Sequence, residues 1–126
     1  MSQELHSSRA PDPVGLYPHA RRTGSLLFLS GIGPRRPGSN EIPDTFEAQC
    51  RSVFANVRAV LEDAGARWED LVDVTVFLTH MERDFPTYNR LYAEHFATAR
   101  PCRTTVEISS LPTAIDIELK CIAELR

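Results

Sequence analysis

The sequence predicts an α+β protein with the element order β-β-α-β-α-β-β, in which two helices pack on one face of a mixed sheet. Two segments, residues 46–64 and 84–96, carry apolar side chains at the three- and four-residue steps of a helix. Short apolar or alternating segments before, between and after them are typical of strands. A chain of 126 residues suits one domain and is too short for a second independent core.

The first two strands are expected on either side of a turn at Gly24 and Ser25. Residues 26–31 open with an apolar run and close with Ser-Gly, which is typical of a short strand buried on both faces. Residues 14–22 can supply its antiparallel partner. Residues 1–13 are polar, contain proline and show no periodicity, so we interpret them as a lead-in to a single domain of residues 14–126.

The first helix is the best-marked element of the sequence. It follows a loop at residues 34–43, and Asp44 is its expected N-cap, with Glu47 at capping-box spacing. Gly65 is expected to end it. The apolar residues that fall on one stripe of this helix are Phe46, Cys50, Val53, Phe54, Val57, Val60, Leu61 and Ala64.

The second half of the chain begins with residues 71–78, whose β-branched and apolar side chains predict a central strand. The second helix has Asp84 near its N-terminus and Pro86 in its first turn, where proline is tolerated. Residues 102–108 and 115–121 alternate and form the last two strands, joined through a Leu-Pro turn region. The apolar face of the second helix carries Phe85, Tyr88, Leu91, Tyr92 and Phe96.

Alternation in the last two strands gathers polar side chains on one face of each. These are Arg103, Thr105 and Glu107 in the first strand, and Asp116, Glu118 and Lys120 in the second. If the helices cover the apolar face, we expect all six on the opposite face. That face either meets solvent, as is common in antiparallel sheets, or lies at a subunit contact that holds a polar site. Alternation alone favours the solvated face.

Composition and charge argue against several classes of partner. The formal net charge is −3, whereas nucleic-acid binding needs a concentrated cationic surface. The apolar runs are far shorter than a membrane span, and the N-terminus lacks an apolar signal core. The three cysteines show no CxxC spacing, and we interpret them as reduced, buried thiols. We therefore expect a cytoplasmic protein with a small-molecule ligand and neither nucleic acid nor membrane as partner.

Familiar cofactor and nucleophile motifs are absent from the sequence. It contains no P-loop, GxGxxG, HExxH or GxSxG motif. The four histidines, His6, His19, His80 and His95, are scattered at spacings that suggest no metal site. We therefore expect no metal and no cofactor.

A series of short motifs runs through residues 14–126 in a specific order. The most specific is Arg-Pro-Cys-Arg-Thr-Thr-Val-Glu at residues 100–107, with Leu-Pro four residues later. The others are Gly15-Leu-Tyr-Pro-His19, Leu29-Ser-Gly31, Asn56-Val57, Ala64-Gly65, Val74-Thr-Val-Phe-Leu78 and Tyr88-Asn-x-x-Tyr92. In this order and spacing the chain resembles the reactive intermediate deaminase (Rid) family. The resemblance implies a chorismate-mutase-like fold, a homotrimer, and active sites in clefts between subunits that use no cofactor.

Arg103 is the central residue of the site that this resemblance implies, where it binds the carboxylate of a 2-imino or 2-amino-enoic acid. A guanidinium suits that role because it can hold a carboxylate through two parallel hydrogen bonds. Thr105 stands where the family often has cysteine, which tells against an obligatory thiol nucleophile, and its backbone carbonyl would help to position a water. The resemblance places Tyr17, Ser30, Gly31 and Asn89 in the pocket lining. Each also has an ordinary structural explanation as a packing, strand-end or helix-surface residue.

Lys120 is a departure from generalist members of the family, which tend to have glutamate there to hold the water. An ammonium group has no lone pair to accept a hydrogen bond, so Lys120 cannot hold the water in that way. Glu118 shares its face and could substitute, although it lies two residues away, about 6–7 Å along a strand. Alternatively, a buried Lys120 with a lowered pKa could pass a proton to departing ammonia.

A further set of residues resembles the 2-aminomuconate deaminase branch of the family. It comprises Tyr17-Pro-His19, Ser30-Gly31 followed by Arg35-Arg36-Pro37, and Ile117-Glu-Leu-Lys120. The chain departs from that branch in a shorter segment between Pro37 and the first helix. Because 2-aminomuconate is a dicarboxylate, its site should offer a second cation besides Arg103. The candidates are Lys120, Arg35, Arg36 and His19, and the two adjacent arginines could equally be solvated.

The sequence therefore supports three hypotheses of function. The first is a 2-aminomuconate deaminase, which would release ammonia and an oxo-dienoate. The second keeps this reaction class for general 2-imino acids. The third is a non-enzymatic metabolite-binding regulator, or the ribonuclease and translation-inhibitor roles attached to relatives, against which the acidic charge balance argues.

Overall fold

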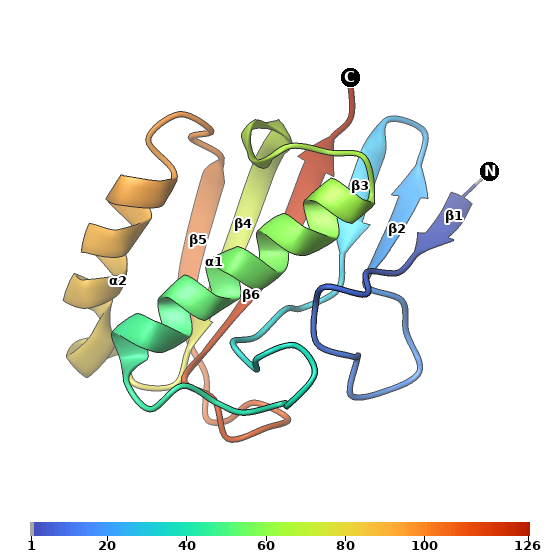
Figure 1. Cartoon of the computed structure of the whole chain (residues 1–126). Helices are drawn as coiled ribbons and strands as arrows, with labels where there is room; N and C mark the ends of the chain where they lie inside the picture. The colour runs from blue at the N-terminus through green and yellow to red at the C-terminus, as the bar shows by residue number, and fades with distance from the viewer. Residues whose placement is uncertain (1) are drawn as a thin grey trace.

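Both helices lie on one face of a six-stranded sheet in the computed structural model, which describes residues 2–126 (Figure 1). The elements in chain order are β1 (Ser2–Leu5), β2 (Ala20–Thr23), β3 (Leu26–Leu29), α1 (Phe46–Asp63), a 3₁₀ turn η1 (Trp68–Asp70), β4 (Leu71–Leu78), α2 (Met81–His95), β5 (Cys102–Glu107) and β6 (Ile117–Glu124). This arrangement confirms the predicted α+β class and the predicted order of the helices and later strands.

The sheet is mixed, with the strand order β1-β2-β3-β6-β4-β5. β4 and β5 are parallel, because α2 connects them, and every other neighbouring pair is antiparallel. The last strand of the chain therefore lies in the middle of the sheet, between β3 and β4. β5 is an edge strand, and α2 packs over this edge (Figure 1).

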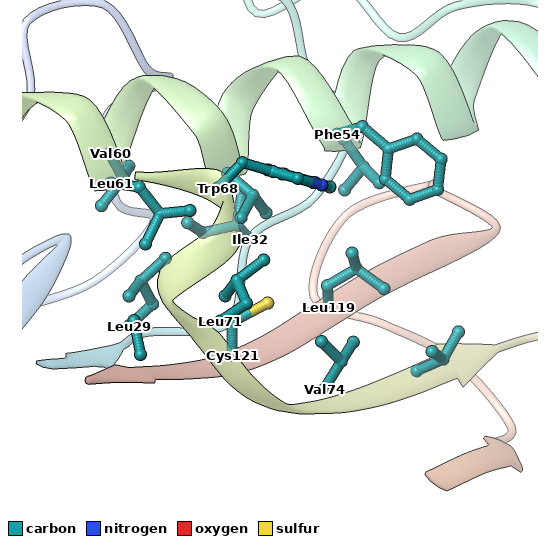
Figure 2. Close-up of a cluster of buried hydrophobic side chains, with 14 of the residues drawn as sticks. Leu29, Ile32, Phe54, Val60, Leu61, Trp68, Leu71, Val74, Leu119 and Cys121 are labelled. Atoms are coloured by element: carbon teal, nitrogen blue, oxygen red, sulfur yellow. The ribbon is translucent and has the colours of Figure 1, made fainter. Parts of the chain in front are cut away.

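The core fills the space between α1, α2 and the sheet. Figure 2 shows Phe54, Val60 and Leu61 of α1 directed toward strand residues such as Leu71 and Leu119. The middle of the predicted apolar stripe of α1 is buried, while its two ends are half-buried and pack against the core. Leu119, on the central strand β6, is fully buried. The 3.6-residue periodicity of the sequence therefore identified the face that α1 turns to the sheet.

The ends of several elements differ from the predictions. Thr45, not Asp44, is the N-cap of α1, and its hydroxyl accepts a hydrogen bond from the amide of Ala48 at 3.1 Å. α2 begins three residues before Asp84, so Pro86 lies inside the helix rather than in its first turn. The polar lead-in contains a strand, β1, which extends the sheet beyond β2.

The three cysteines do not share one environment. Cys50 and Cys121 are buried in the core, and burial raises the pKa of each thiol to about 12, so both are neutral at physiological pH. Cys102 is exposed at the start of β5, so the prediction that all three are buried is wrong for this one. It lies on the edge strand β5, which has a neighbouring strand, β4, on one side only.

Candidate active site

Arg103 lies under α2, on the helix-covered side of the edge strand β5. It pairs in register with Val74 of β4, which is fully buried on that side, and paired residues of neighbouring strands share a face. Its guanidinium carbon lies 4.6 Å from the ring centroid of Tyr92 and 5.7 Å from that of Phe85. Its Nη1 donates to Oδ1 of Asn89 at 2.9 Å. Cation–π contacts and this hydrogen bond therefore hold the guanidinium in one orientation.

The expected common face of the six polar residues is wrong. Thr105 lies with Arg103 on the helix side, because it pairs with buried Val76. On β6 the buried, helix-facing residues include Ile117 and Leu119, so Glu118 and Lys120 point to the open face of the sheet. Asp116 precedes β6, and its carboxylate contacts Gln49 of α1 and Arg83 of α2. Alternation shows which residues of a strand share a face but not which face meets the helices. An edge strand can turn an arginine toward a helix, because its aliphatic part packs on aromatic rings while its charged end reaches solvent.

Arg103 and Thr105 open onto a cleft of about 570 Å³. Its other lining residues are Met81, Glu82, Phe85 and Pro86. The hydroxyls of Thr105, Tyr88 and Tyr92 are buried and have no hydrogen-bond partner among residues 2–126. Burial raises the pKa of both tyrosines, so both remain neutral phenols. This cleft thus offers the Arg103 guanidinium and a largely apolar wall formed by Met81, Phe85 and Pro86.

Glu118 and Gly31 meet on the open side of the sheet, where β3 ends. Phe28 pairs with Ile122, but Ile32 pairs with Leu119. The chain therefore advances four residues beyond Phe28 while β6 advances only three. This shift is a β-bulge, which re-aims the side chains beside it. A Cβ built on Gly31 would lie 2.9 Å from Cδ of Glu118, closer than real Cβ contacts allow. Only glycine therefore lets the Glu118 carboxyl group lie against this backbone.

Glu118 lines a second cleft, of about 140 Å³, together with Tyr17, Gly31 and Arg35. Burial raises the pKa of Glu118. Ser30 lies beside this cleft, and its hydroxyl donates to the carbonyl of Pro18 at 2.7 Å. A carboxyl group whose pKa is raised toward neutrality can accept and return a proton during a reaction. This cleft therefore places a half-buried carboxyl group with a raised pKa beside one arginine.

The structure separates the four candidates for a second cationic anchor. Arg35 lines the cleft with Glu118. Lys120 donates instead to the carbonyl of Leu29, and Arg36 lies in a different groove along α1. His19 is 7% exposed and its two ring nitrogens are both occupied, one by the amide of Ser7 and one by the carbonyl of Pro11. Arg35 is thus the candidate that can reach a ligand near Glu118.

The predicted site residues therefore form two groups rather than one. Arg103, Thr105 and Asn89 gather on the helix side at the β5 edge, and Glu118, Gly31, Tyr17 and Arg35 gather on the open side. The sheet lies between the two clefts, and no residue lines both. Within one chain, Arg103 and Glu118 cannot contact the same small ligand.

Two site features were missed in the sequence. Phe85 and Tyr92 were identified as apolar residues of α2, but they also flank the Arg103 guanidinium. Their seven-residue spacing on one helix face, beside a strand with a single arginine, was the available signal. The sequence carries no sign of the contact between Glu118 and Gly31, because that contact depends on the bulge where β3 ends. Within residues 2–126, no three side chains of His, Cys, Asp or Glu gather as a metal site, and no helix is long and apolar enough to cross a membrane.

Comparison with known proteins assigns the chain to a family. Residues 7–125 match the family model described as endoribonuclease L-PSP. The chain belongs to this family, the Rid family. A RutC family protein of Pyrococcus horikoshii is 39% identical over 124 residues, which cover 98% of each chain. A RutC family protein of Haemophilus influenzae is 35% identical, with 98% of this chain and 97% of the relative covered.

Solved structures of Rid family members superpose closely on this fold. YyfA of Yersinia pestis, described as a conserved Rid protein of unknown function, has a TM-score of 0.93 at 31% identity and covers 99% of this chain and 100% of its own. TdcF of Escherichia coli, solved with bound serine, has a TM-score of 0.92 at 32% identity, with 98% and 99% covered. A putative endoribonuclease of Thermotoga maritima reaches 0.94 at 34% identity, with 100% and 99% covered. Members of the family therefore share this fold, although their names refer to different activities.

Glu118 provides a prediction about stability and pH. Its raised pKa means that the folded protein disfavours the carboxylate, so folding is penalised once the pH exceeds the raised value. Below the usual glutamate pKa of about 4.3 both states are protonated and the penalty disappears. We expect Glu118→Gln to unfold at higher urea concentration than the wild type at pH 7, with the difference closing as the pH falls toward 4. A wild type that is more stable than the variant at pH 7 would contradict this.

Proposed function

We propose that the chain is a cytoplasmic, cofactor-independent deaminase that hydrolyses the C–N bond of an enamine or imine carboxylic acid. The observation that carries this proposal is the Arg103 guanidinium, held by Asn89 and aromatic rings at the wall of an open cleft. A guanidinium fixed in this way can bind and orient a carboxylate. The two separated clefts support a further point, that Arg103 of one copy joins Glu118 of a neighbouring copy in a homotrimer.

The chemistry requires only a proton carrier, a water and an anchor. The enamine takes a proton on carbon and becomes an imine, and water then adds to the imine carbon. Glu118 would carry a proton from this water to nitrogen, which gives a carbinolamine, and would then carry the hydroxyl proton to nitrogen in the same way, so that the C–N bond breaks, the carbonyl forms and ammonia leaves. Arg103 would hold the carboxylate so that the imine carbon faces the water, and the backbone carbonyl of Thr105 would help to position that water.

For the substrate we propose a dicarboxylate enamine such as 2-aminomuconate, because Arg35 shares the cleft with Glu118. A guanidinium has five N–H groups. Arg35 uses two of them, one to Oδ1 of Asn40 at 2.8 Å and one to the carbonyl of Asp12 at 2.7 Å. The remaining N–H groups can bind a second carboxylate while Arg103 binds the first.

A second candidate is a general deaminase of monocarboxylic 2-imino acids. Met81, Phe85 and Pro86 make the wall beside Arg103 apolar, which suits an aliphatic side chain better than a second charge. TdcF, which shares the fold, was solved with serine, a small acid with a single carboxylate. The two candidates differ in whether Arg35 takes part in binding.

Arg35→Met separates these candidates. Ammonia release is measured with 2-aminomuconate and with 2-iminobutyrate, both generated in the assay by a coupled enzyme. If Arg35 binds a second carboxylate, the variant loses about tenfold or more in kcat/KM for the dicarboxylate, roughly what a charge-assisted hydrogen bond contributes, and little for the monocarboxylate. Equal losses for both substrates favour the general deaminase. No ammonia from either substrate with the wild type contradicts both candidates.

A further inference from the structure

Residues 7–13 cross from β1 toward the cleft that holds Glu118, and we call them the N-terminal strap. The strap is pinned at its beginning to Asp63, the last residue of α1. The hydroxyl of Ser7 donates to Oδ2 of Asp63 at 2.6 Å. Arg9 donates to Oδ1 of the same carboxylate through Nη2 at 2.8 Å and Nε at 3.1 Å. One carboxylate more than 50 residues away therefore holds both ends of a three-residue segment.

An acidic residue at this place does not stabilise α1 by itself. The C-terminal end of a helix carries a partial negative charge, which favours cations and disfavours carboxylates. The last turn of α1 contains no basic residue, yet it ends with Glu62 and Asp63. Arg9 supplies the missing cation, because it also contacts Glu62 at 3.2 Å and the carbonyl of Ala59 at 3.3 Å. The hydrogen bonds from Arg9 and Ser7 lower the pKa of Asp63, so the carboxylate stays ionised.

We call the hydrogen bonds of Asp63 to Ser7 and Arg9 the clamp. From the clamp the strap continues to the candidate active site. The ring of His19 forms two hydrogen bonds with the strap. Its Nδ1 accepts from the amide of Ser7 at 3.0 Å, so the ring proton lies on Nε2. Nε2 donates this proton to the carbonyl of Pro11 at 2.8 Å. The next carbonyl, that of Asp12, accepts from Nη2 of Arg35 at 2.7 Å. The strap is thus a chain of hydrogen bonds that begins at Asp63 and ends on the guanidinium of Arg35.

We propose that Asp63 is a positioning residue for Arg35 and thereby determines how well the site selects a ligand with a second carboxylate. This inference rests on the proposed role of Arg35 in binding that carboxylate. Asp63 touches no ligand itself. It fixes Ser7 and Arg9, and the strap then presents the carbonyl of Asp12 at the position where it aims Arg35 into the cleft. Without the contacts of Asp63, Arg35 keeps its charge and its hydrogen bond to Asn40, but the carbonyl of Asp12 is no longer held at the position that orients the guanidinium toward the cleft.

The test compares two ligands that differ in one carboxylate, muconate and sorbate, both six-carbon dienoic acids. Binding is measured by titration calorimetry on the full chain, so the result does not depend on catalysis. The variants are Asp63→Ala, Arg9→Met and Arg35→Met. Glu47→Ala is the matched control, because Glu47 also lies on α1 and pairs with two arginines, Arg51 and Arg90, but has no contact with the strap.

For the wild type we expect muconate to bind about tenfold or more tightly than sorbate, as one additional charge-assisted hydrogen bond would give. Asp63→Ala and Arg9→Met should both bring this ratio close to that of Arg35→Met, whereas Glu47→Ala should leave it unchanged. The two clamp variants change the net charge in opposite directions. A long-range charge effect would therefore move the ratio in opposite directions, and that result would overturn the proposal.

The remaining outcomes are also decisive. If neither the wild type nor Arg35→Met prefers muconate over sorbate, Arg35 does not bind a second carboxylate, and the positioning role of Asp63 fails with it. If Arg35→Met loses the preference for muconate while Asp63→Ala and Arg9→Met keep it, the role of Arg35 stands and the inference about Asp63 is wrong. If Glu47→Ala also loses the preference for muconate, the effect comes from destabilising α1 in general, and this would also overturn the inference.

Discussion

Replacement of Arg103 by alanine is expected to lower kcat/KM for ammonia release by about 100- to 1,000-fold, the loss typical of removing one partner of a hydrogen-bonded charge pair. The substrate carboxylate would lose the cation of this cleft, because none of the other residues that line it carries a positive charge. Arg103→Lys should recover only part of this loss, because an ammonium group cannot form two parallel hydrogen bonds in a fixed plane. The measurement is steady-state kinetics with an enzymatically generated substrate.

Arg90→Ala is the matched control for this experiment. Arg90 is an exposed arginine of α2, next in sequence to Asn89, but it pairs with Glu47 rather than with the site. Its replacement should leave kcat/KM within about twofold of the wild type, because an exposed ion pair contributes little. An Arg103→Ala variant with wild-type activity would show that this guanidinium does not bind the substrate.

The second large effect is expected for Gly31→Ala. The new methyl group would meet the carboxyl group of Glu118, which is at the end of a flexible side chain, so the carboxyl group should move away while the fold remains intact. We expect about a 100-fold loss of kcat or more, within the usual contribution of a general acid–base group, with little change in the urea midpoint. Circular dichroism and urea unfolding check the fold, and the ammonia assay checks the activity.

Gly24→Ala should show the opposite result. Gly24 lies at the turn between β2 and β3 with a φ of 60°, and no atom lies within 4 Å of a Cβ built there. Alanine in this left-handed conformation should cost about 1 kcal/mol of stability without changing the activity. If Gly31→Ala lost stability and kept activity as Gly24→Ala does, the contact between Gly31 and Glu118 would have no catalytic role.

The regular elements were the part of the fold that the sequence could predict. The helices follow from apolar periodicity, and β4 matches the predicted range 71–78 because a β-branched run there is bounded on both sides. The N-cap of α1 was off by one residue because Asp44 and Thr45 both suit that position, and the backbone conformation decides between them. β1 was missed because its short polar sequence carries no apolar pattern, and it forms by pairing with β2.

The candidate site was predicted as a set of residues but not as an arrangement. Alternation cannot show that Arg103 faces α2 while Glu118 faces away, since this depends on the parallel pairing of β5 with β4. Which of Glu118 and Lys120 lies against Gly31 depends on one extra residue between Phe28 and Ile32, where β3 ends, and the sequence does not show this register shift. His19 looked like an anchor because of its position in a motif, but its ring serves to hold the N-terminal strap.

The composite site is tested most directly by mixing two inactive variants, Arg103→Ala and Glu118→Gln. In a cyclic trimer whose sites each take Arg103 from one copy and Glu118 from the next, every mixed trimer regains one intact site. When equal amounts are unfolded together and refolded, we expect about a quarter of the wild-type ammonia release, because about three quarters of randomly assembled trimers are mixed and each has one intact site in three. Activity that stays at the level of the separate variants would contradict a site shared between copies.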